Sequence, residues 1–98
     1  MKKPVNYKEF QESLLNNEPP KVWPEALKAL WFDAKGNWEA SHNIAQDMDS
    51  QIGSLIHAYL HRKEGDKFNA GYWYRQANKS LPEISFDAEL KEIVESLL

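Results

Sequence analysis

The chain has 98 residues, no cysteine, and a formal net charge of −3 at pH 7. This length predicts one domain spanning residues 1–98, and the acidic balance argues against nucleic acid or a membrane as a partner. The lack of cysteine excludes disulfides and thiolate metal sites. Because the start MKKPVNYKEF lacks the apolar core of a secretion signal, we expect a cytoplasmic protein.

The first half of the chain predicts three helices. A capping box begins the first helix, over about residues 6–16, and NNEPP ends it. The second helix carries an apolar stripe and ends at a glycine, after which an asparagine caps a third helix that begins WEASHNIAQ. In chain order, the residues behind these predictions are Asn6 and Glu9 (capping box), Pro24 (first helical position), Leu27, Leu30, Trp31 and Ala34 (stripe), Gly36 (stop) and Asn37 (cap).

The second half predicts three more helices by the same signals. A polar loop over residues 47–51 precedes the fourth helix, and Asp49 or Ser50 can cap it. Gly65 ends that helix and Asp66 caps the fifth, KFNAGYWYRQANK. Pro82 lies beyond the fifth helix, and Ser85 caps the last one. No segment alternates with a period of two, so we predict an all-α fold of about five or six short helices, a core over about 24–80 flanked by helices at about 6–16 and 85–97.

The second to fifth helices contain an internal repeat. Gly36 and Gly65 are 29 residues apart, and each lies between two predicted helices and before an Asn or Asp cap. The second copy resembles the tetratricopeptide and Sel1-like helical hairpins, and this resemblance implies two helical hairpins in one compact bundle. The matching positions are Ala58, Gly65, Ala70, Tyr74, Ala77 and Pro82.

A longer stretch resembles one particular family. The segments ALKALWFDAKGNWEASHNIAQ and HAYLHRKEGDKFNAGYWYRQA, together spanning about residues 26–77, are similar to a family of small uncharacterised bacterial proteins that share a HAYLHRKEGD-type signature. The resemblance implies a helical protein and carries no particular activity.

The three histidines form a candidate metal site. His57 and His61 are four residues apart, so they lie on one face of the fourth helix. If the third and fourth helices form an antiparallel hairpin, His42 lies opposite His57 and Trp38 lies opposite His61. Three converging imidazoles could bind Zn or Fe, with Asp47 or Glu64 nearby. We take as the default that these are hydrogen-bonded or partly exposed histidines at a helix interface, with no bound cofactor, and the metal site is the alternative.

The fifth helix has two apolar faces. Ala70, Trp73, Tyr74 and Ala77 share one face, and Phe68, Tyr72 and Gln76 share the other. Such a helix is either packed between neighbours on both sides, which we take as the default, or it presents an aromatic face to a groove.

These features predict a small binding module that recognises a protein, a peptide or a small polar ligand. One alternative is a metal-dependent or histidine-based enzyme that uses His42, His57 and His61, and another is a homodimer. Fold resemblance is a weak basis for function, so the prediction depends mainly on the predicted ligand-binding residues. These are Trp38, His42, Gln46, His57, His61, Asn69 and Tyr72.

Overall fold

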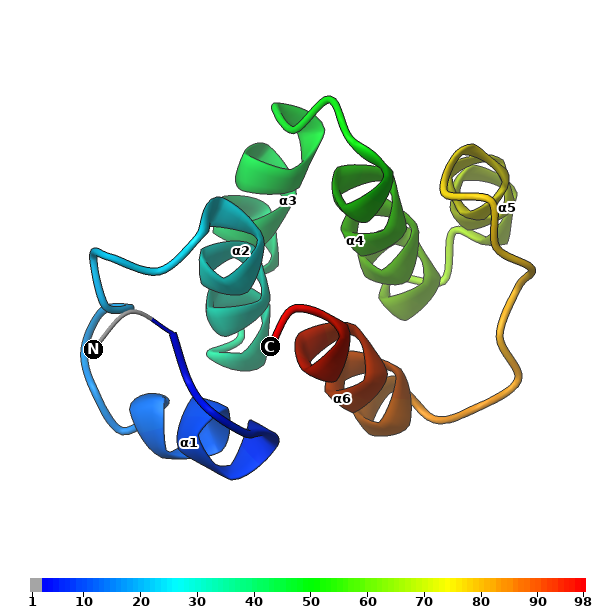
Figure 1. Ribbon diagram of the computed structural model, residues 1–98. Helices are drawn as coiled ribbons and strands as arrows, with labels where there is room; N and C mark the ends of the chain where they lie inside the picture. Colours follow the sequence, from blue (N-terminus) through cyan, green and yellow to red (C-terminus); the bar gives the residue numbers. More distant parts are fainter. Residues whose placement is uncertain (1–2) are drawn as a thin grey trace.

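The computed structural model describes residues 3–98 and contains six helices and no strand in that range. The predicted all-α fold is therefore confirmed (Figure 1). None of these helices has the length and apolar character that a bilayer crossing requires. The helices are α1 (Tyr7–Ser13), α2 (Glu25–Ala34), α3 (Trp38–Gln46), α4 (Gln51–Lys63), α5 (Lys67–Gln76) and α6 (Phe86–Ser96).

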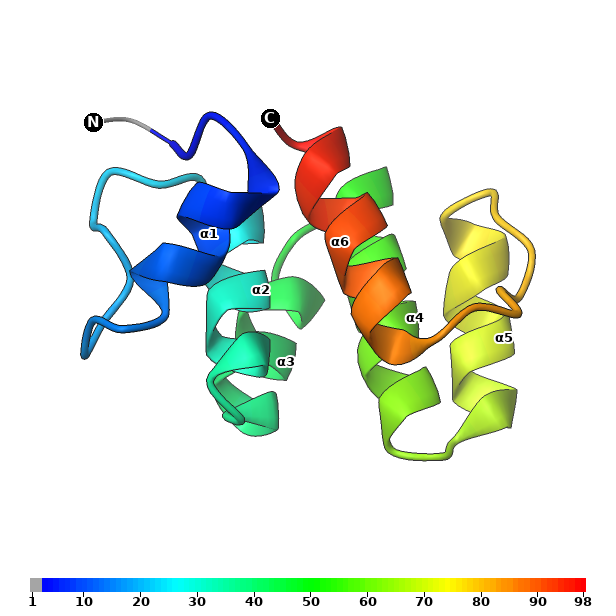
Figure 2. The same cartoon turned by 90° about the horizontal axis from the view of Figure 1, so that it is seen from below.

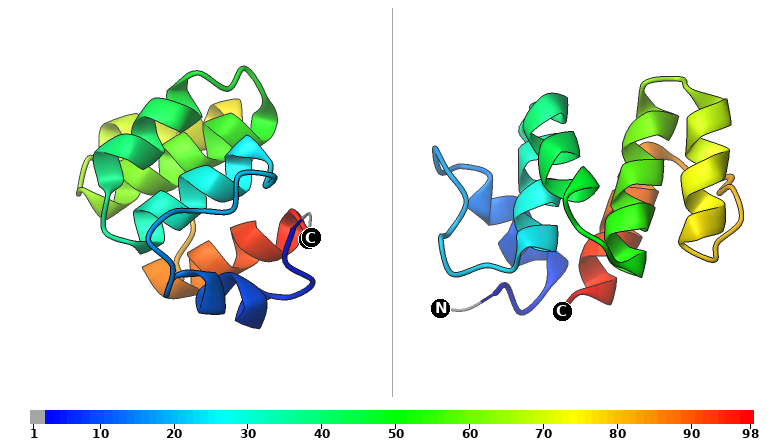
Figure 3. Two further views of the ribbon diagram at one scale, coloured as in Figure 1. Left: turned by 90° about the vertical axis from the view of Figure 1, so that its left-hand side faces the viewer. Right: turned by 90° about the horizontal axis from the view of Figure 1, so that it is seen from above.

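Four helices follow one another side by side. The chain runs up and down through α2, α3, α4 and α5, and each packs on the next (Figure 3, right). Helices α1 and α6 pack on each other, and α6 also contacts α2 and α4 from below (Figure 1). The view from below shows α6 lying along α4, while α5 stands at the outer edge (Figure 2). The site described below lies among α3, α4 and α5, away from α1.

The main core fills the space between α2, α4 and α6, with Phe10 of α1 closing one side. It contains large side chains such as Trp31 and Tyr59, both almost fully buried. A second, smaller cluster of Ala58, Ala70 and Tyr74 joins α4 to α5. Alanines at these two positions allow the two helices to approach closely, because they have no bulky side chain to separate the backbones.

The predicted stop signals form one recurring turn. Gly36 and Gly65 adopt positive φ angles of 84° and 85°. The next residue, Asn37 or Asp66, donates its backbone N–H to a carbonyl five residues earlier, and its side chain caps the following helix. This is the Schellman arrangement, in which a left-handed residue closes the helix. Asn78 ends α5 in the same way with φ of 60°, which explains why α5 stops before the predicted ANK.

Two further predicted boundaries differ from the structure. Helix α1 ends at Ser13 rather than near residue 16, because the last residues form tighter turns with hydrogen bonds to carbonyls three residues back. Pro24 is the N-cap of α2 rather than its first helical residue. The predicted caps Asn6, Ser50 and Ser85 each accept a hydrogen bond from a backbone N–H three residues on.

Helix α5 is not packed on both sides, so that default interpretation is wrong. Its inner face carries Ala70 and Tyr74 against α4. On its outer face Phe68 is 84% exposed and Tyr72 is 45% exposed. The helix lies at the edge of the row, where no other described element covers that face.

Candidate functional site

A close contact between α3 and α4 sets the register of the site. Gly53, in the first turn of α4, lies so close to Met48 that a Cβ atom there would be 2.5 Å from the Met48 carbonyl oxygen. Only glycine fits at that distance. This contact, together with the Ser50 cap, turns the chain sharply and places His42 of α3 across from His57 of α4.

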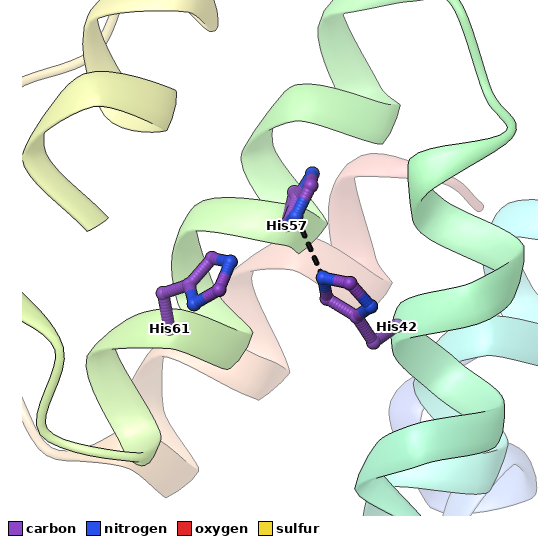
Figure 4. Close-up of side chains that lie close together, drawn as sticks. All are labelled: His42, His57 and His61. Atoms are coloured by element: carbon purple, nitrogen blue, oxygen red, sulfur yellow. Dashed lines mark hydrogen bonds between the residues drawn. The ribbon is translucent and has the colours of Figure 1, made fainter. Parts of the chain in front are cut away.

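The three histidines come together at this interface (Figure 4). The Nε2 atoms of His42 and His57 are 2.8 Å apart and share a hydrogen bond, in which one ring donates and the other accepts. His61 lies one helical turn beyond His57, and its ring points toward the other two. One nitrogen from each ring lies within 4.8 Å of the others.

Two tryptophans flank the histidines. Trp38 stacks on His42 with ring centroids 4.7 Å apart, and its indole N–H donates to the Leu60 carbonyl over 2.8 Å. Trp73 of α5 stacks on His57 with centroids 4.1 Å apart. These contacts restrict the rotation of two imidazoles, and they surround the ring nitrogens with apolar surface.

Trp73 belongs to this cluster although the sequence analysis assigned it only to the packing face of the fifth helix. The spacing of His57 and Trp73 from the turn at Gly65 indicates this contact. His57 and Trp73 are each eight residues from Gly65, and residues equidistant from the turn of an antiparallel hairpin face each other.

Burial keeps two of the histidines neutral near pH 7. Desolvation is the largest cause that lowers the pKa of His57, to about 4, and the neighbouring His42 and His61 lower it further. Desolvation also lowers the pKa of His42, with a smaller contribution from His61. A neutral imidazole has a free lone pair, which is the form that binds a metal ion.

Glu64 orients the third histidine. Its Oε1 lies 2.6 Å from Nδ1 of His61, so Nδ1–H donates to the carboxylate and Nε2 is left with its lone pair toward the other rings. A carboxylate behind a histidine is the usual outer contact of a metal-binding imidazole. The predicted acidic neighbour Asp47 is exposed at the end of α3 and is not part of the cluster.

Three of the predicted ligand-binding residues lie outside the histidine cluster. Gln46 is exposed one turn beyond His42. The Asn69 amide donates to Asp66 over 2.6 Å, a local contact at the start of α5. Tyr72 contacts Trp73 edge to face, with centroids 5.0 Å apart, but it points outward. The structure therefore brings together Trp38, His42, His57 and His61 from the predicted set, and adds Trp73.

The spacing of the three imidazoles suits a transition-metal ion after small side-chain rotations. In tetrahedral zinc sites the Zn–N bonds are about 2.0–2.1 Å, which separates two ligand nitrogens by about 3.3 Å. To bind one ion, the Nε2 atoms of His42 and His57, which are 2.8 Å apart, must separate slightly. Ligand nitrogens that are farther apart than this, up to 4.8 Å, must approach one another. Such a site can polarise a bound carbonyl group or activate a bound water molecule.

A comparison with protein-family models, curated proteins and solved structures finds no match to this chain, so the resemblances to the HAYLHRKEGD-type family and to tetratricopeptide hairpins stay predictions.

Proposed function

We propose that the protein binds a divalent transition-metal ion through His42, His57 and His61. The observation that carries this proposal is the convergence of three imidazole nitrogens from two helices to within 4.8 Å of one another. Neutral imidazole suits zinc, copper and nickel, whereas non-haem iron sites usually add a carboxylate ligand. We therefore put zinc ahead of iron.

The surroundings of the cluster support a metal site over a purely structural one. Among the three imidazole rings, a hydrogen bond joins His42 and His57. His61 stacks on His57 with ring centroids 4.9 Å apart, and Glu64 bonds to it from behind, so its ring is directed toward the other two (Figure 4). The predicted binding module and the predicted metal enzyme both use these residues.

The test is a calorimetric titration of zinc into protein purified without a polyhistidine tag. The chain has three histidines, all in this cluster, and no cysteine. A second group of possible ligands, His61 with Glu64 and Asp66, lacks His42, so the variant His42→Asn distinguishes the two. We expect one zinc per chain. Each of the single variants His42→Asn and His61→Asn should weaken binding by more than about 100-fold, since loss of an outer contact alone costs about 10–100-fold.

Gln46→Ala is the matched control. This exposed side chain lies on α3 one turn from His42, and its loss should leave zinc affinity unchanged. Circular dichroism checks that each variant keeps its helices. If the wild-type protein shows no saturable zinc binding, or if the histidine variants bind as well as Gln46→Ala, the proposal is wrong.

A second candidate is homodimerisation through the outer face of α5. Phe68 is 84% exposed there, and Tyr72, one turn further along the same face, is 45% exposed. A second copy of this helix can cover both residues by two-fold symmetry. Solution mass measurement should show a dimer for the wild type and a monomer for Phe68→Ser. A wild-type monomer at high concentration would exclude this candidate.

A further inference from the structure

The carboxylates near the three histidines, which could act as metal ligands, already accept hydrogen bonds from other groups. The Oε1 atom of Glu64 accepts from His61. Both carboxylate oxygens of Asp66 accept from Asn69, one from its backbone N–H and one from its side-chain amide. Among residues 3–98, no further His, Asp or Glu joins His42, His57 and His61 as a fourth member of their cluster.

Three protein ligands make an incomplete tetrahedral site. Structural zinc sites take four ligands from the chain, whereas sites with three leave one position for water or an external ligand. His42 and His61 are only partly buried, so the cluster reaches the surface. An external ligand can therefore approach the metal from solvent.

The charge of the site favours an anion in that position. Three neutral imidazoles leave the full double positive charge on the metal. Among residues 3–98, Glu64 bonds to His61 from behind, and Asp66 lies within 4.8 Å of the same pair. A ligand that brings its own negative charge is stabilised by a strong attraction in this partly apolar surrounding.

Resting on the proposed function, we propose that the metal held by His42, His57 and His61 has an open fourth position that binds a small exogenous anion, such as a carboxylate. The rings of Trp38 and Trp73 stand on either side of the histidines, each held against an imidazole. The indole N–H of Trp38 is also anchored to Leu60. These stacked rings place apolar surface beside the ligand nitrogens.

The test uses cobalt(II) in place of zinc, because cobalt has a visible absorption that depends on its ligands. The untagged protein is loaded with one equivalent of cobalt in a non-coordinating buffer, and acetate or thiocyanate is then titrated in. We expect a visible band on loading, followed by a saturable change in that band with each anion. Gln46→Ala should give the same titration as the wild type.

Glu64→Gln separates the proposal from its main rival, in which Glu64 leaves His61 and fills the fourth position itself. Glutamine can still accept the hydrogen bond from His61 but has no charged carboxylate. An anion response in both proteins supports the open position. If neither anion changes the cobalt band of the wild type, the open position is overturned. A band that changes with anions only in Glu64→Gln identifies Glu64 as the fourth ligand.

The two proposals fail in different ways. Without a cobalt band in the wild type, the metal site itself is wrong, and the open position falls with it. If cobalt binds but neither anion changes the band across the titration, the metal site stands and only the open position is overturned.

Discussion

At the scale of single residues, His57 is the most perturbed group of the site. It is 7% exposed, stacked on Trp73, and hydrogen-bonded to His42. A histidine without a carboxylate partner in such a place resists protonation, because burial disfavours the charged ring. Packing thus maintains its neutral form, which is also the form that binds a metal ion.

This perturbation predicts a pH-dependent stability. The pKa of His57 falls from 6.5 to about 4 on folding, so the unfolded chain binds the proton more readily between these values. The free energy of unfolding should therefore fall as the pH drops from about 6.5 to about 4, and this contribution should be fully present above pH 6.5. Urea unfolding at pH 7 and at pH 4.5 measures the difference.

His57→Phe is the comparison for that measurement. Phenylalanine keeps an aromatic ring against Trp73 but cannot be protonated, whereas the carboxylates titrate alike in both proteins. The variant should lose less stability than the wild type between the two pH values. Equal losses would contradict the prediction.

At the scale of elements, the close approach of the α3–α4 loop to α4 matters more than helix propensity. Gly53 lies in a helix, where alanine normally stabilises by about 1 kcal/mol. A Cβ atom at Gly53, however, would overlap the Met48 carbonyl oxygen and Cβ, at 2.5 and 2.7 Å. The loop and helix would have to separate, and the His42–His57 contact depends on that register.

Gly53→Ala and Gly71→Ala make a matched pair for this argument. Gly53→Ala should destabilise the protein by about 1–3 kcal/mol, as overpacking does. At Gly71 in α5 the nearest atom to a new Cβ is an Arg75 guanidinium nitrogen at 3.5 Å, an ordinary contact. Gly71→Ala should therefore stabilise by about 0.5–1 kcal/mol. Denaturant unfolding of both variants is the measurement. If both substitutions change the free energy of unfolding in the same direction, the prediction is contradicted.

At the scale of the whole molecule, two buried carboxylates join the end of α4 to other helices. Glu89 of α6 accepts from Arg62 over 2.8 Å and from the Tyr74 hydroxyl over 2.5 Å. Asp33 of α2 accepts from Lys63 over 2.9 Å and from the Tyr59 hydroxyl over 3.1 Å. The two networks start from neighbouring residues of α4, so one helix turn holds α2, α5 and α6 in place.

Substitution of Glu89 should therefore lower the free energy of unfolding. Glu89 is 4% exposed, and Glu89→Ala leaves the Arg62 charge without its partner, which costs about 3–5 kcal/mol in buried pairs. Tyr74→Phe removes one hydrogen bond to a carboxylate and should cost about 1.5–3 kcal/mol. Glu92→Ala, on an exposed position of α6, is the control and should change stability by less than about 0.5 kcal/mol. Denaturant unfolding compares all three, and a Glu89→Ala loss as small as the control's would contradict the argument.

The sequence by itself determined the helices, their caps and the stops at Gly36 and Gly65, because these depend on residues within a few positions of one another. It also determined that His57 and His61 share a face, since that follows from helical spacing alone. The approach of His42 could be predicted only on the condition that α3 and α4 form an antiparallel hairpin.

Only the tertiary structure decided how the faces meet. The stacking of Trp73 on His57, the orientation of His61 by Glu64, and the exposure of Phe68 depend on which helices are neighbours and at what register. Register in turn depends on contacts far apart in the chain, such as those of Glu89 with Arg62 and Tyr74. A periodic pattern shows which side of a helix is apolar, but the partner that covers that side is chosen by the packing of the whole chain.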